Sequence, residues 1–91
     1  MGIEDVEDAD AAAVRPEPLG DSEVSALLRD LGTRAASLRR DAGYTQVELA
    51  ERSAVHFITI SRLERGAQTV SVAVLWRLAH AMGKNVSDFL P

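Results

Sequence analysis

Apolar residues recur three and four positions apart from residue 22 onward, which places them on one face of a helix. In the first such segment this face comprises Val24, Leu27, Leu28, Leu31, Ala35, Leu38 and Ala42. We predict a helix that is capped at its start by Asp21 or Ser22 and ends at Gly43. Gly32 lies in its middle and costs about 1 kcal/mol relative to alanine, which favours a division into two pieces, Leu31 to Ala42 being the firmer one.

The pattern predicts several shorter helices after Gly43. The segment Thr45-Gln46-Val47-Glu48 matches a capping box and starts the first of them. Gly66 and Gly83 end the next two, and Ser71 can cap the last long one. The expected elements are Gln46 to Ser53, about Phe57 to Arg65, Val72 to about Met82, and a final turn at Val86, Phe89 and Leu90. No segment alternates as a strand does, so the fold class is all-α with about five helices.

The second and third predicted helices are short and are separated by a turn of about three residues at Val55 and His56. Their inner faces are expected to pack together through Leu49, Ala50, Val55, Ile60 and Leu63. Ala50 is small, which suits a close crossing of the two helices. Two short helices joined in this way form the helix-turn-helix pattern, in which the second helix is presented to the major groove of DNA.

The formal charge is −4 over 91 residues, but it is unevenly distributed. Residues 1–30 hold nine acids and two bases, a balance of −7, whereas residues 31–91 hold five acids and eight bases, a balance of +3. Residues 1–20 are acidic and alanine-rich, with Pro16 and Pro18 near their end. Such a segment buries too little apolar surface to offset its ordering entropy. We therefore expect a disordered acidic tail over residues 1–20 and a mildly basic domain over residues 22–91.

Residues 31–83 together resemble the Cro and lambda-repressor type of DNA-binding domain, also called the Xre family. The resemblance covers about two-thirds of the chain. It rests on Thr45-Gln46 with Glu48-Leu49-Ala50, on Ile60-Ser61 with Leu63-Glu64 and Gly66, and on Leu75 with Leu78-Ala79 and Met82-Gly83. It implies a five-helix domain whose third helix, about residues 57–65, enters the major groove.

The resemblance also implies which residues touch DNA. Gln46 starts the second helix, whose N-terminal N–H groups suit a phosphate. Phe57, Ile58 and Arg62 take the base-facing positions, with Thr59 and Ser61 nearby. Gln68 and Thr69 follow the third helix in a loop along the DNA backbone. Arg39 and Arg40 are expected on a solvated face.

Two features depart from the family pattern. Alanine stands at position 54 where relatives usually have glycine, so this turn either carries strain or takes another geometry. Phe57 and Ile58 cannot hydrogen-bond a base edge, although both can contact a thymine methyl, which leaves a guanine contact to Arg62. His56 is a candidate helix cap at the turn.

The residue inventory argues against catalysis. The chain has no cysteine, its two histidines are far apart, and it has no glycine-rich phosphate loop. We expect no enzyme, no cofactor and no metal site. No apolar run approaches the ~20 residues of a membrane span, and the acidic N-terminus is not a signal peptide. A soluble cytoplasmic protein is the expectation.

Two functions remain open. The first is a transcriptional regulator that binds a pseudo-palindromic double-stranded operator as a homodimer, with Val86, Phe89, Leu90 and Trp76 as candidates for the subunit interface. Phage repressors, restriction–modification controllers and antitoxins are all similar at this length, and the sequence does not choose among them. The second is a protein-interaction module that uses the same fold through an exposed Phe57-Ile58 face.

Overall fold

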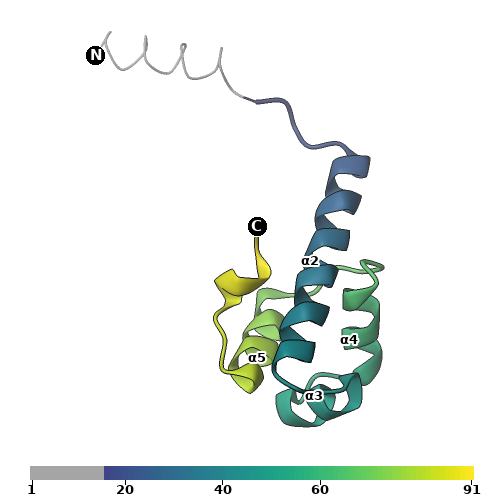
Figure 1. The fold of residues 1–91 in the computed structure, drawn as a ribbon. Helices are drawn as coiled ribbons and strands as arrows, with labels where there is room; N and C mark the ends of the chain where they lie inside the picture. The colour runs from purple at the N-terminus through teal and green to yellow at the C-terminus, as the bar shows by residue number, and fades with distance from the viewer. Residues whose placement is uncertain (1–15) are drawn as a thin grey trace, which may run out of the picture.

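The computed structural model describes residues 16–91, and this part of the chain is all-α, as predicted. Its elements are α2 (Asp21–Asp41), α3 (Gln46–Ser53), α4 (Phe57–Glu64), α5 (Val72–Met82) and the 3₁₀ helix η1 (Val86–Phe89) (Figure 1). The predicted five helices are thus four α-helices and one 3₁₀ turn within the described residues. The disordered tail expected over residues 1–20 lies mostly outside the described part of the chain.

The first helix differs from its prediction at its start and its middle. Gly20 is the N-cap residue, and its N–H donates to Glu23 Oε1 at 2.9 Å, so neither Asp21 nor Ser22 caps the helix. The helix is also continuous through Gly32. Gly32 is buried because α2 crosses the C-terminal end of α4 there, and the absence of a side chain lets the two backbones approach. The propensity cost of Gly32 is therefore outweighed by tertiary packing.

The segment from α3 to α4 forms as the sequence predicts. Thr45 Oγ1 accepts from Glu48 N–H at 3.1 Å, and Glu48 Oε1 accepts from Thr45 N–H at 2.8 Å, which completes the capping box. Ala54 takes the left-handed conformation (φ 58°, ψ 30°) that a glycine would favour. The turn thus takes the left-handed geometry and carries the strain of an alanine with positive φ.

The core lies between α2, the α3–α4 pair, α5 and η1. Leu49, Val55, Ile60 and Leu63 are buried in it as predicted, and Ala50 is half-buried. The core also includes four buried residues of α5: Leu75, Leu78, Ala79 and Met82. Phe89 is fully buried, which places it in the core rather than at a subunit interface as expected. Val72, at the start of α5, is exposed.

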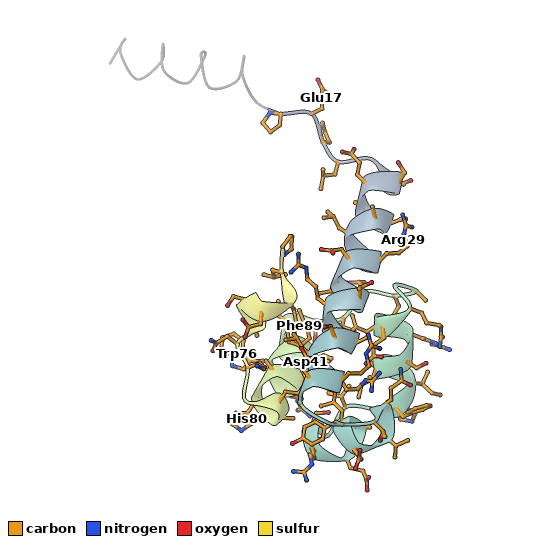
Figure 2. All side chains as sticks on the ribbon, viewed as in Figure 1. Glu17, Arg29, Asp41, Trp76, His80 and Phe89 are labelled. Carbon is orange, nitrogen blue, oxygen red and sulfur yellow. The ribbon has the colours of Figure 1, made fainter. Side chains whose placement is uncertain are left out.

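Two apolar regions lie outside the core. Trp76 projects from α5 with 65% of its surface exposed, so it does not pack against α2 (Figure 2). The N-terminal half of α2 stands clear of α3, α4 and α5, and the C-terminal end of the chain lies beside α2 (Figure 1). Val24 and Leu27 on that half of α2 are exposed, whereas Ala35 further along the same face is buried.

Candidate nucleic-acid interface

The two faces of α4 differ in polarity and burial. Ile60 and Leu63 anchor one face in the core at 1% exposure each. At 100° per residue, the opposite face carries Ile58, Ser61, Arg62 and Arg65. Ile58, Arg62 and Arg65 are exposed and Ser61 is half-buried. The helix therefore presents one apolar and three polar side chains outward.

The start of α4 is held by its own cap. His56 Nδ1 accepts a hydrogen bond from Ile58 N–H at 3.0 Å, which confirms the predicted capping role of His56. Phe57 and Ile58 immediately follow, with 41% and 46% of their surfaces exposed. Much of the Phe57 ring is therefore accessible. Thr59 is half-buried beside them.

Behind the outward face of α4, Glu64 links α4 to α2 and α3. Its carboxylate accepts from Arg39 Nε at 2.7 Å and from Arg39 Nη2 at 3.0 Å, and it also accepts from Gln46 Nε2 at 2.9 Å. Arg39 also donates to the Tyr44 carbonyl oxygen at 2.8 Å. The side chains of Arg39 and Glu64 are only 12% and 7% exposed. These bonds fix the position of α3 and α4 relative to α2.

The network changes the expectation for two residues. Arg39 is not on a solvated face: it is bound to Glu64, and the hydrogen bond that it donates to that carboxylate raises the pKa of the Arg39 guanidinium. Gln46 is half-buried, with its amide turned to Glu64 rather than extended into solvent. A phosphate contact by Gln46 must therefore use its backbone N–H or the remaining amide hydrogen. Arg40 is exposed, as expected.

The structure adds Arg65, which the sequence analysis did not single out. Arg65 lies four residues after Ser61, and its guanidinium donates to Ser61 Oγ at 2.5 Å. The spacing from Ile58 through Ser61 and Arg62 to Arg65 is the signal that could have identified it, because these residues share one helical face. Gln68 and Thr69 lie in the loop after α4, Gln68 half-buried and Thr69 exposed.

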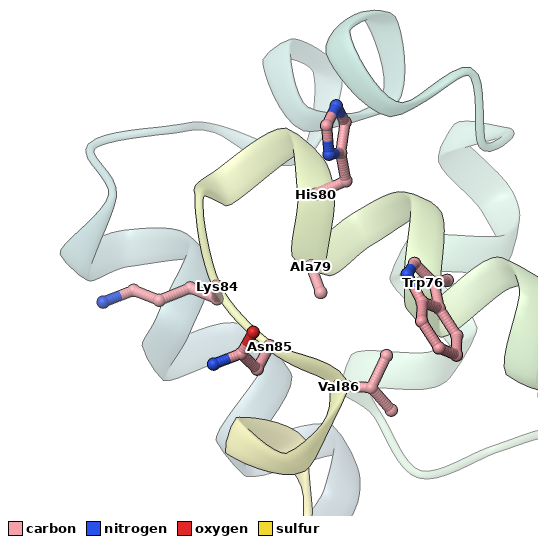
Figure 3. A pocket seen from close by; sticks show the side chains of 6 residues that line it. All are labelled: Trp76, Ala79, His80, Lys84, Asn85 and Val86. Carbon is pink, nitrogen blue, oxygen red and sulfur yellow. The ribbon is translucent and has the colours of Figure 1, made fainter.

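A separate cavity of about 380 Å³ lies beside Trp76, where α5 ends and the chain turns toward η1 (Figure 3). Its lining residues are Trp76, Ala79, His80, Lys84, Asn85 and Val86. None of them belongs to α4 or to the predicted DNA contacts. In the part of the chain that is described, no group of three or more His, Cys, Asp or Glu side chains is placed to hold a metal ion. Among the same residues, no helix is long and apolar enough to cross a membrane.

A Helix-turn-helix family model matches residues 36–89, which include all of α3, the turn and α4. The chain belongs to the helix-turn-helix family, in the Cro and lambda-repressor type. Over 53 residues it is 42% identical to y4dJ of Sinorhizobium fredii, an uncharacterized HTH-type transcriptional regulator. That match covers 58% of this chain and 69% of y4dJ.

Solved structures of similar proteins agree with this assignment. The clp gene regulator ClgR from Corynebacterium glutamicum superposes with a TM-score of 0.65 at 42% identity, over 81% of this chain and 71% of that one. The restriction-modification controller protein C.AhdI from Aeromonas hydrophila superposes with a TM-score of 0.67 at 28% identity, over 69% of this chain and 96% of that one. The helix-turn-helix seen in the geometry is thus shared with known regulators.

Proposed function

We infer that this helix-turn-helix transcription regulator binds double-stranded DNA sequence-specifically by placing α4 in the major groove. The observation that carries the inference is the outward face of α4, where Ile58, Arg62 and Arg65 are exposed while Ile60 and Leu63 anchor the helix from behind. An anchored helix with an exposed mixed face can enter the groove without unfolding anything. The similarity to y4dJ, ClgR and C.AhdI supports the regulatory role.

Base recognition is assigned to the first turns of α4. Arg62 is the candidate for a bidentate bond to guanine, whereas Phe57 and Ile58 offer apolar surface to thymine methyl groups. Thr59 and Ser61 are half-buried and supply hydroxyls at the edge of the contact. This distribution predicts half-sites in which thymine-rich positions neighbour a guanine.

Phosphate contacts are assigned to both sides of α4. Gln46 lies at the N-terminus of α3, where unpaired backbone N–H groups favour an anion. Gln68 and Thr69 lie in the loop after α4, and Arg65 adds a charge that is not neutralised by a carboxylate within the described residues. Contacts of this kind orient the protein without selecting sequence.

We also propose that the regulator acts as a homodimer on a pseudo-palindromic operator. A dimer presents two copies of α4 about 34 Å apart, one turn of B-DNA. Two copies double the number of phosphates that are neutralised, so binding should weaken steeply with salt.

A protein-interaction module is the second candidate, favoured by the exposure of Phe57 and Ile58 side by side. Two adjacent apolar side chains on a helix can fill a hydrophobic groove of a partner. On this alternative the same α4 face would bind protein instead of DNA.

The test is a selection of bound duplexes from a random DNA pool, followed by titration of the enriched duplex at several salt concentrations. We expect an enriched inverted repeat whose affinity falls with salt. Replacing Phe57 and Ile58 by alanine should reduce discrimination among sequences while keeping the salt slope, and Trp76→Ala on α5 serves as the matched control. If no sequence is enriched and Phe57→Ala/Ile58→Ala abolishes capture of a protein, the second candidate replaces the first.

A further inference from the structure

The apolar face of α2 continues beyond the part of the domain that covers it. Ala35 is 4% exposed within the core, and Leu28 and Leu31 are half-buried one to two turns earlier. Val24 and Leu27 continue the same face at 42% and 47% exposure. From Val24 to Leu31 the exposed stripe is about two helical turns long.

This stripe forms one wall of a groove of about 480 Å³, and the C-terminal end of the chain forms the other. Phe89 closes the base of the groove from the core, and Leu90 borders it with 49% of its surface exposed. Every residue that lines the groove is apolar. A contiguous apolar groove on a small domain marks a surface that binds another molecule.

Packing within the domain stabilises this part of α2 less than the rest of the helix. A helical end that projects without tertiary packing is marginal in water, since most helical stability comes from burying the apolar face. Leu28 and Leu31 are half-buried by the domain itself, whereas Val24 and Leu27 are more exposed. An apolar helix laid in the groove would cover both.

We propose that the occupant is the same stripe of a second copy of this chain, packed antiparallel to form the dimer on which the proposed DNA binding depends. A two-fold interface uses the same patch on both copies, so the patch must complement itself. An antiparallel register that sets Leu27 against Leu28 of the second copy also sets Val24 against Leu31. Every layer of the contact is then apolar.

The charges beside the stripe fit the same register. Arg34 and Glu23 lie on the same flank of α2, about eleven residues apart. In the antiparallel register Arg34 lies level with Asp21 of the second copy and about 3 Å along the axis from its Glu23. Arg34 is half-exposed, and among residues 16–91 its one side-chain bond is to Asp30 of its own helix at 3.0 Å, so a second carboxylate can reach it. A parallel pair would place like charges at the same level.

The first experiment measures the mass of the full chain by sedimentation equilibrium over a range of concentrations. We expect the wild type to be a dimer and Leu27→Asp to be a monomer with an unchanged helical CD spectrum. Trp76→Asp is the matched control, because Trp76 is still more exposed but lies outside the groove, and it should stay dimeric. A monomeric wild type overturns the proposal, as does a dimer that Leu27→Asp leaves intact or that Trp76→Asp dissociates. A full chain that is monomeric and dimerises only after removal of residues 1–15 would assign the groove to that segment, which also overturns the proposal.

A charge reversal tests the register independently of core packing. Arg34→Glu should weaken the dimer at least tenfold by facing Glu23 of the second copy. Because Glu23→Arg also removes the acceptor of the Gly20 N–H, recovery is measured against Glu23→Arg alone, and adding Arg34→Glu to that variant should strengthen its dimer. Failure of the double variant to recover overturns the antiparallel register.

Titration with the enriched inverted repeat and with a single half-site separates this dimer proposal from the proposed DNA binding. Leu27→Asp should lose cooperative binding to the enriched inverted repeat and keep its affinity for a single half-site. A wild type that binds half-sites independently as a monomer overturns the dimer and leaves DNA binding intact. A dimer that binds no DNA would leave the α2 interface intact and overturn the proposed DNA binding.

Discussion

Gly32 of α2 packs against the carbonyl oxygen of Leu63 in α4 so closely that a Cβ atom on Gly32 would overlap it. The same Cβ would lie 2.8 Å from the carbonyl oxygen of Glu64. Both obstacles are backbone atoms, which cannot rotate away as a side chain can. This contact sets the distance between α2 and α4, and therefore how far α4 projects from the domain.

Gly32→Ala is expected to destabilise the protein by about 1–3 kcal/mol through overpacking, although alanine is the better helix former by about 1 kcal/mol. Urea unfolding followed by circular dichroism measures the change. Ser37→Ala, at an exposed position of the same helix, is the control and should lie within about 0.5 kcal/mol of wild type. A stabilised Gly32→Ala would contradict the close crossing.

Removal of Glu64 should be costly because Arg39 would keep a poorly solvated charge without its partner. We expect Glu64→Ala to lower the free energy of unfolding by about 3 kcal/mol. Asp30→Ala breaks the ion pair between Asp30 and Arg34, whose side chains are 44% and 42% exposed respectively. Because this pair is exposed, its loss should cost less than about 1 kcal/mol of stability. Equal effects of the two variants would show that the Arg39–Glu64 pair has no special role in holding the helices.

Ala54→Gly should stabilise the turn between α3 and α4. Ala54 has φ 58°, a conformation that costs an L-residue about 1–2 kcal/mol. Part of that gain is offset by the greater backbone freedom of glycine in the unfolded chain, so a net increase of about 0.5–1 kcal/mol is expected. Thermal unfolding of the two proteins measures it, and an unchanged or lower midpoint would be inconsistent with strain at Ala54.

Glu48 should make stability depend on acid pH. The N–H of Thr45, and then its side chain, hold the pKa of the Glu48 carboxyl below its ordinary value. A lowered pKa in the folded state stabilises the protein above the ordinary pKa, and this contribution is lost as pH falls through the lowered value. Glu48→Gln keeps an acceptor but does not titrate. At neutral pH this variant should therefore be less stable than wild type, and the difference in stability should shrink toward about pH 2. Unfolding midpoints across that range provide the test, and a constant deficit would disprove the coupling.

Arg65 should contribute to DNA affinity more than to sequence choice. Arg65→Gln removes a charge on the outward face of α4, so affinity should fall similarly for enriched and random duplexes. The slope of log affinity against log salt concentration should become shallower by about one unit, which corresponds to one phosphate contact. Arg77→Gln, at an exposed position of α5, is the control. A loss confined to the enriched duplex would instead assign Arg65 to base recognition.

Much of the fold follows from local signals. The capping box at Thr45 and Glu48 and the glycines at 43, 66 and 83 fix helix ends, because capping and positive φ depend only on neighbouring residues. The bounds of α3 and α5 were therefore predicted correctly. The start of α2 was not, because Glu23 reaches back to the N–H of Gly20, one residue before the expected caps.

The candidate site divides in the same way. The sequence by itself determined the helix-turn-helix, because helical periodicity and capping assign residues to faces and helix ends. Its resemblance to the Cro and lambda-repressor type implied the outward positions of Phe57, Ile58 and Arg62, which are exposed in the structure. Only the tertiary structure decided that Glu64 holds both Gln46 and Arg39, that Phe89 is buried while Leu27 is exposed, and that Gly32 belongs inside a continuous helix. Those outcomes depend on which distant backbone or side chain covers each residue, and periodicity along one helix carries no information about its neighbours in space.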